Sequence, residues 1–195
     1  MMILRYGIAA GLVLSVGLLA GTPAEAAGKP KKDAFALTSA DFKDNGVLAT
    51  QYANTGAASS GGECGGKNVS PQLSWKNVPA GTKSFAFLML DPDGAGGMGV
   101  SHWVAYGIPA GKTAAARGEM SKAGQFVGGK NTRGMDVYMG PCPPVGDPWH
   151  HYIIQLFALD VAPNELPPGL TRDDFLAKVK GKVKGEASLV GRYTR

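Results

Sequence analysis

Four short apolar runs, separated by turns rich in glycine and proline, form the clearest pattern along the chain. Residues 84–90 (SFAFLML) are apolar almost throughout, which is typical of a strand buried on both faces. Residues 72–75, 102–108 and 152–159 are bounded by turn residues, and the last run is rich in β-branched and aromatic side chains. The 29 glycines and 13 prolines follow no fixed period. The pattern therefore predicts one strand-rich domain.

Three further segments carry weaker signals. Residues 35–37 and 47–49 are short strand candidates near the start of the predicted domain. Residues 182–193 (KVKGEASLVGRY) alternate only in part between polar and apolar, so both a strand and a helix remain open for them.

One helix is predicted near the C-terminal end. Thr171 is a good N-cap residue, and Asp174 follows three positions later, as in a capping box. Gly181 is a suitable stop. Three apolar residues between them fall on one face: Phe175, Leu176 and Val179.

The N-terminal residues predict an export signal. Arg5 precedes an apolar run over residues 6–20, and Ala-Glu-Ala follows at 24–26, so we expect cleavage after Ala26. The alternative is an uncleaved anchor, although the run is shorter than the roughly 20 residues that span a bilayer. We therefore predict a signal peptide over 1–26, a flexible lead-in over 27–34 and a single domain over 35–195. The mature protein would be periplasmic or secreted, without stable membrane insertion.

The charge balance gives only a weak indication of partners. Cleavage would remove one cation and one acid, Arg5 and Glu25, which leaves the net charge at +5. Such a mild excess favours anionic partners. The lysines lie in loops and near the C-terminus without an interleaved stripe of arginine and aromatic residues, so nucleic acid is not expected as a partner.

The two cysteines, Cys64 and Cys142, both lie in loop-like sequence, GGECGG and GPCPP. An even number of cysteines in an exported chain indicates a disulfide. Two separate buried thiols remain the alternative, because the sequence does not give the distance between the Cα atoms. Neither cysteine belongs to a C-x-x-C motif, so no metal site is predicted for the pair.

The candidate chemistry lies at the ends of the predicted strands. Asp91 follows the buried run 84–90, whereas His102 and His150 stand at the entrances of two other runs. Each has an ordinary structural explanation, an Asx-turn for the acid and a solvated cap for each histidine. If the three converge, Asp91 would orient one imidazole and the rings would present N–H donors to an anion. The proline-rich residues 139–144 would form a rigid wall, and residues 129–131 read as a turn.

The chain from about residue 35 to 193 resembles the phosphatidylethanolamine-binding protein family, in its bacterial Raf-kinase-inhibitor-like branch. The blocks that carry the resemblance occur in order at consistent spacing: NVSPQLSW at 68–75, PAGTKSF at 79–85, DPD at 91–93, HWV at 102–104, and GPCPP at 140–144 followed by HHY at 150–152. The resemblance implies a mainly β fold with a large antiparallel sheet, a smaller sheet and peripheral helices. It also implies a small pocket for phosphate-like groups, without a cofactor.

The resemblance assigns this pocket residue by residue. The positions that match are Asp91, His102, His150, Pro143, Pro144 and Tyr152. His151 stands where the family often has arginine, and we take it as flanking. Two departures occur: Gly94-Ala95 follow Asp93 where the family has Ala-Pro, and Val100-Ser101 precede His102 where it has tryptophan. We therefore expect a smaller and more mobile pocket rim.

The leading functional hypothesis is an exported binding module that takes a small anionic or phosphorylated ligand and modulates a protein partner. A hydrolytic enzyme is the first alternative, with the Asp/His cluster as acid and base or metal ligands. The chain lacks a G-x-S-x-G elbow and an evident activated nucleophile, which disfavours catalysis. A protease-inhibitor-type interaction protein is the second alternative, although no reactive loop is marked.

Overall fold

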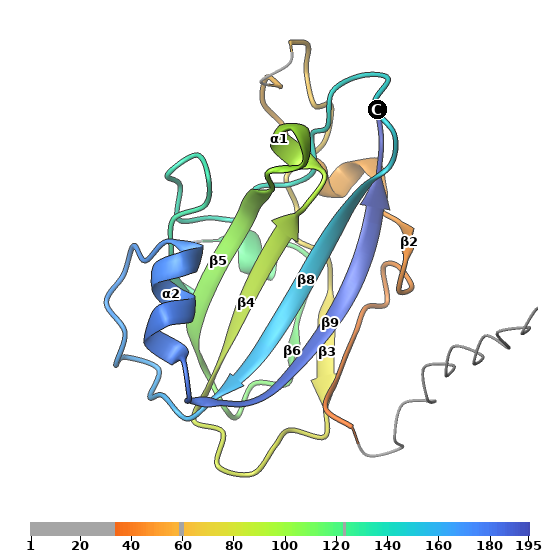
Figure 1. Ribbon diagram of the computed structural model, residues 1–195. Helices are drawn as coiled ribbons and strands as arrows, with labels where there is room; N and C mark the ends of the chain where they lie inside the picture. Colours follow the sequence, from red (N-terminus) through yellow and green to blue (C-terminus); the bar gives the residue numbers. More distant parts are fainter. Residues whose placement is uncertain (1–33, 59–60, 123) are drawn as a thin grey trace, which may run out of the picture. The chain divides into compact units, whose positions relative to one another are not determined.

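The computed structural model describes residues 34–58, 61–122 and 124–195. The predicted signal sequence and the lead-in up to residue 33 lie outside the described residues. The described domain is built from two sheets with short helices around them (Figure 1).

The large sheet has six strands in the order β2-β9-β8-β4-β5-β7. Its strands are β2 (Gly46–Val47), β9 (Val183–Tyr193), β8 (His150–Leu159), β4 (Ser84–Asp91), β5 (Val100–Pro109) and β7 (Val127–Gly128). All neighbours are antiparallel except β2, which runs parallel to β9 at one edge. The small sheet has the order β1-β3-β6, with β1 (Ala36–Thr38), β3 (Leu73–Lys76) and β6 (Ala114–Ala115). The predicted pair of a large and a small sheet is confirmed.

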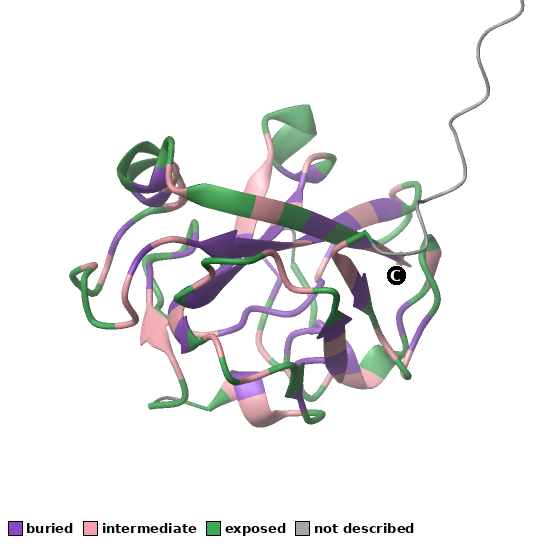
Figure 2. Cartoon of the chain, turned by 90° about the horizontal axis from the view of Figure 1, so that it is seen from below, coloured by how far each residue is buried: buried purple, intermediate pink, exposed green. Residues whose placement is uncertain are grey.

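All predicted strands occur, with shifted ends. The open segment 182–193 is strand β9, because it pairs with β8 from Leu159 back to His150. A helix over this segment would leave the edge of β8 without partners. Toward the C-terminal end its buried residues alternate with exposed or half-buried ones, as expected for a strand with one covered face (Figure 2).

Strand β4 is the centre of the core. Phe85 and Phe87 face the small sheet, where Trp75 of β3 meets both rings edge-on with centroids 5.4 Å away. Ala86 and Leu88 face the opposite side and join a second apolar cluster. The strand is therefore buried on both faces, as its apolar run predicts.

Helix α2 (Arg172–Val179) covers the second face of the large sheet, and lies beside β5 in Figure 1. Its N-cap is Thr171, whose side chain accepts a hydrogen bond from the amide of Asp174, as predicted. Phe175 is fully buried and stacks on Tyr106 of β5, with ring centroids 5.5 Å apart. Burial of this face against the sheet fixes the helix, since eight residues are too few for a stable isolated helix.

The connection from β4 to β5 contains the short turn α1 (Gly94–Gly97), which the sequence pattern did not predict as an element. Ala95 and Gly96 have positive φ values of 54° and 67°. This left-handed backbone is unfavourable for alanine but open to glycine. Two single-turn 3-10 helices, η1 (Thr50–Tyr52) and η2 (Glu119–Ser121), complete the described elements.

Candidate functional site

The antiparallel order of the large sheet brings the strand ends together. Strand β4 lies between β5 and β8 and runs opposite to both. The residue at which β4 ends, Asp91, therefore lies beside the starts of its two neighbours. His150 is the first residue of β8, and His102 lies two residues after the start of β5. The structure thus places the three side chains at one end of the sheet.

Asp91 is buried, and its two carboxylate oxygens have different partners. Oδ1 accepts hydrogen bonds from the amides of Asp93 and Gly94, at 3.0 and 2.9 Å. This is the Asx-turn that the sequence allows. Oδ2 lies 2.8 Å from Nδ1 of His150 and 3.8 Å from Nε2 of His102, the second distance being too long for a hydrogen bond. Asp91 therefore closes a turn with one oxygen and contacts the histidines of the site with the other.

The hydrogen bonds of the two histidines define which ring nitrogen carries the proton in the neutral form. His102 Nδ1 lies 2.8 Å from the carbonyl oxygen of Met139, and His150 Nδ1 faces the carboxylate of Asp91. Both partners are acceptors, so Nδ1 is the donor in each ring. Nε2 then holds a lone pair in the neutral ring and becomes a donor when the ring is protonated. Nε2 of His150 lies 3.5 Å from Oδ2 of Asp147.

The charge state of Asp91 follows from opposing effects. Burial disfavours the carboxylate, whereas His150 stabilises it through a hydrogen bond and both histidines stabilise it through positive charge. The histidines outweigh the burial, so the pKa of Asp91 is lowered from its ordinary value. Asp91 is therefore an anion at neutral pH, with one oxygen aimed at the histidines.

Tyr152 stands behind the two histidines on β8. Its ring meets His102 edge-on at 5.1 Å between centroids, and the residue is fully buried. Burial and the nearby charge of Asp91 raise the pKa of Tyr152 far above its ordinary value, so the hydroxyl keeps its proton. That hydroxyl has no hydrogen-bond partner among the described residues. A buried donor without a partner is costly, which makes it available to a ligand or a water molecule.

A cavity of about 540 Å³ opens over these side chains. All six residues that the family resemblance assigns to the pocket line it: Asp91, His102, His150, Pro143, Pro144 and Tyr152. Such a volume is in the range of small-molecule sites. The structure therefore brings the predicted residues together, while their role in binding remains a proposal.

Sequence reasoning missed five polar residues that also line the cavity, namely Asn54, Asp93, Thr132, Arg133 and Asp147. Asp147 had a usable signal, because it lies three residues before His150 in the same loop. Asp93 lies two residues after Asp91. Asn54, Thr132 and Arg133 come from other loops, and only the fold brings them to the site. His151, taken as flanking, does not line the cavity and instead contacts Asp93 at 2.9 Å.

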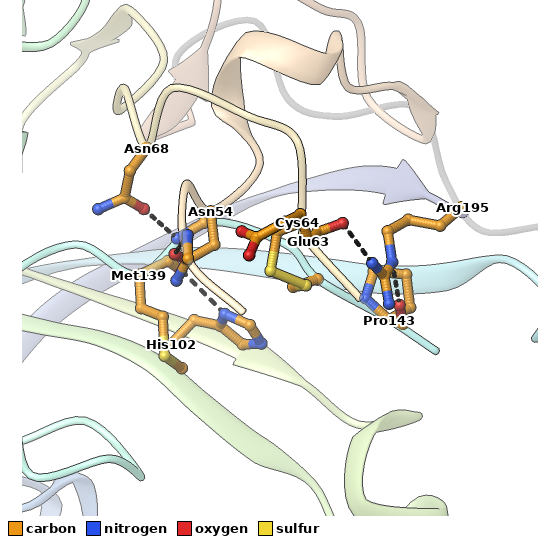
Figure 3. The surroundings of a disulfide bond; sticks show 11 residues. Asn54, Glu63, Cys64, Asn68, His102, Met139, Pro143 and Arg195 are labelled. Atoms are coloured by element: carbon orange, nitrogen blue, oxygen red, sulfur yellow. Dashed lines mark hydrogen bonds between the residues drawn. A yellow bond between two sulfur atoms is a disulfide. The ribbon is translucent and has the colours of Figure 1, made fainter. Parts of the chain in front are cut away.

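The predicted disulfide is confirmed. Cys64 and Cys142 are bonded, with their Cα atoms 5.2 Å apart, and Cys142 lines the cavity. The bond ties the loop before β3 to the proline-rich wall of the site (Figure 3). The same wall is held at its other end by the Asn68 side chain, which donates to Tyr138 O and accepts from the amide of Gly140.

Among residues 34–58, 61–122 and 124–195, no group of three or more histidine, cysteine, aspartate or glutamate side chains is placed to hold a metal ion. Within the same ranges, no helix has the length and apolar character needed to cross a membrane.

Comparisons with known proteins agree on one family. The family model described as phosphatidylethanolamine-binding protein matches residues 38–194. The UPF0098 protein of Aquifex aeolicus is 42% identical over 135 residues, which cover 68% of this chain and 78% of the relative. The Mycobacterium tuberculosis protein named "Putative lipoprotein LppC" is 36% identical over 174 residues, covering 89% and 77%.

The fold agrees with a solved structure of the same family. The crystal structure of Escherichia coli YbcL, described as a new member of the mammalian PEBP family, superposes with a TM-score of 0.73 at 31% identity. The match covers 83% of this chain and 98% of YbcL. These bacterial relatives are consistent with the Raf-kinase-inhibitor-like branch. On sequence and on fold alike, the chain belongs to the phosphatidylethanolamine-binding protein family.

Proposed function

We propose that the protein is an exported binding module whose cavity takes a phosphate-like group of a small molecule or lipid head group. The observation that carries the proposal is the arrangement of His102 and His150. Each uses Nδ1 for a protein acceptor, and within the described part of the chain neither Nε2 nor the nearby hydroxyl of Tyr152 has a hydrogen-bond partner. Protonated rings and a tyrosine hydroxyl are donors suited to phosphate oxygens.

The charges around the cavity make binding depend on protonation. Three lining residues are carboxylates, Asp91, Asp93 and Asp147, whereas Arg133 is the lining residue with a permanent positive charge. With neutral histidines the lining carries a formal charge of −2, and with both protonated it is neutral. The cavity is therefore expected to bind an anion only when the two histidines are protonated.

Asp147 favours a ligand that carries both charges. Its carboxylate is 44% exposed and lies next to His150 at the cavity lining. A zwitterion with a phosphate at the histidines and an ammonium at Asp147 would satisfy both sides. Phosphorylethanolamine, the head group in the family's description, has this form.

Export is supported by the sequence signal over residues 1–26 and by the lipoprotein description of the relative LppC. Modulation of a protein partner rests on the resemblance to the Raf-kinase-inhibitor-like branch, and the chemistry of that partner is open.

Calorimetry with phosphorylethanolamine and inorganic phosphate tests the proposal. His102→Ala and His150→Ala should each weaken binding by tenfold or more, because each removes a charge-assisted donor worth about 1.5–3 kcal/mol. The matched control is His151→Ala, which removes the remaining histidine, outside the cavity, and should weaken binding far less, because it removes a contact to Asp93 and no donor of the cavity. Asp147→Asn should weaken phosphorylethanolamine more than inorganic phosphate.

The pH dependence and turnover separate the proposal from the enzymatic alternative. Affinity should fall with rising pH, because neutral imidazole rings no longer present a positive charge to the anion. Phosphoester substrates, incubated with and without divalent metal, should stay intact. Hydrolysis that is lost in His150→Ala would contradict a pure binding role, and equal affinity in the double histidine variant would contradict the site.

A further inference from the structure

The cavity wall over residues 139–147 has no regular secondary structure. Pro141, Pro143 and Pro144 have no amide hydrogen, so the wall cannot form the reciprocal backbone ladder of a strand. Its carbonyl groups need donors from other parts of the chain. Asn54 supplies one of them, because its amide donates to Pro141 O at 3.0 Å.

Arg195 supplies the next donors along the wall. Its Nε donates to Pro143 O at 2.6 Å, and its Nη1 donates to Glu63 O at 2.7 Å (Figure 3). Glu63 precedes Cys64, and Pro143 follows Cys142. One guanidinium therefore joins the same two segments that the disulfide joins covalently.

The disulfide and the hydrogen bonds of Arg195 together restrict the cavity wall more than either link does alone. A disulfide fixes the distance between two segments but lets them pivot about its single bonds. The guanidinium is planar and donates in fixed directions, so a second link through Arg195 opposes the pivot. The face of Pro143 and Pro144 that lines the cavity is then fixed in direction as well as in position.

The backbone around Arg195 connects this wall to the histidine side of the cavity. Tyr193 pairs with His150 across β9 and β8. The Thr194 hydroxyl donates to Asp147 O at 3.0 Å, and the amide of Gly146 donates to Arg195 O at 3.3 Å. The wall is therefore held against the strand that carries His150.

We propose that Arg195 is a positioning residue for the ligand site: without lining the cavity, it sets the wall of Pro143 and Pro144 relative to His150. The proposal rests on the proposed binding function. A preset wall lowers the ordering cost of binding, so loss of the link should reduce affinity even where the fold is kept.

Calorimetry with phosphorylethanolamine tests the effect on affinity. Arg195→Met should weaken binding roughly tenfold. The affinity of Arg195→Lys should lie between those of the wild type and Arg195→Met, because an ammonium group can still reach one carbonyl group. The matched control is Lys184→Met, which removes a cation from β9, the strand that precedes Arg195; Lys184 pairs with Asp160 at 3.1 Å. In a Cys64→Ala/Cys142→Ala background, Arg195→Met should weaken binding by much less than it does with the disulfide intact. Without the disulfide the wall is already free to move, so the second link has less to preserve.

Amide hydrogen exchange gives a readout that needs no ligand. In Arg195→Met the amide of Gly146 should exchange faster, whereas the amide of Gly140, held by Asn68, should keep its rate. If the wild type binds no phosphate compound, the proposed function fails while this exchange still decides the role of Arg195. A lower melting temperature with unchanged affinity and unchanged Gly146 exchange, or an equal effect of Lys184→Met, would overturn the inference.

Discussion

Asp91 shows how one side chain serves both the fold and the site. One oxygen closes the turn after β4 through two amides, and the other orients His150. The carboxylate is therefore fixed by the backbone before any ligand is present, which keeps the imidazole in one orientation. Sequence alone suggested these two uses as competing explanations, whereas the two oxygens allow both.

The lowered pKa of Asp91 gives a prediction for stability. A carboxyl group whose folded pKa lies below its unfolded value stabilises the protein above the ordinary value of 3.8, and this stabilisation is lost as pH falls through the folded value. The difference in free energy of unfolding between wild type and Asp91→Asn should therefore be largest above pH 4 and shrink below it. Urea unfolding at several pH values measures this difference.

The control for this measurement is Asp173→Asn, which changes a carboxylate that is 90% exposed and should alter stability little at any pH. A wild-type advantage over Asp91→Asn that stays constant from pH 7 to below pH 3 would contradict the assigned role of the carboxylate.

At the scale of elements, the site is a product of strand order and of loops tied to it. Strands β4, β5 and β8 place the acid and the histidines, because an antiparallel neighbour begins where β4 ends. The opposite wall is a coil, and it depends on the disulfide and on side chains that donate to its carbonyl groups. One side of the cavity is thus held by strand pairing, and the other by a disulfide and by side-chain hydrogen bonds.

The disulfide should contribute strongly to stability. The cysteines are 78 positions apart, for which chain-entropy reasoning gives at most about 4–5 kcal/mol. Reduction should lower the melting temperature of the wild type and leave that of Cys64→Ala/Cys142→Ala unchanged. Melting curves with and without reductant measure this, and two titratable thiols in the native, unreduced protein would show that the bond is absent in solution.

At the scale of the whole molecule, the sequence predicts separate roles for the described domain and the N-terminal segment. The family match begins at residue 38, after the predicted signal and lead-in. A cleaved signal would deliver the domain to an oxidising compartment, where the bond between Cys64 and Cys142 can form and persist.

Cleavage after Ala26 is therefore the prediction at this scale. Intact-mass measurement of protein from the cell envelope should give a chain that begins at Ala27. A variant with Ala24 and Ala26 replaced by bulky residues should accumulate as precursor, since the site requires small side chains. Recovery of the full-length wild-type chain from the cytoplasm would contradict export.

The sequence by itself determined the strand-rich class, the buried strand β4, the N-cap of α2 and the residues of the site that the family blocks carry. These features depend on local patterns: unbroken apolar character for burial on two faces, a capping box for the helix start, and short motifs around Asp91, His102 and His150. Each can be read within a window of about ten residues.

Only the tertiary structure decided the rest. Strand β9 was ambiguous because its local pattern is mixed, and its pairing with β8 settled it. No local sequence pattern marks Asn54, Arg133 or Arg195 as part of the site. They lie in segments that are distant in sequence and that only the fold brings together. Long-range hydrogen bonds to a proline-rich wall leave no local pattern, because the acceptors are backbone carbonyl groups that every residue carries.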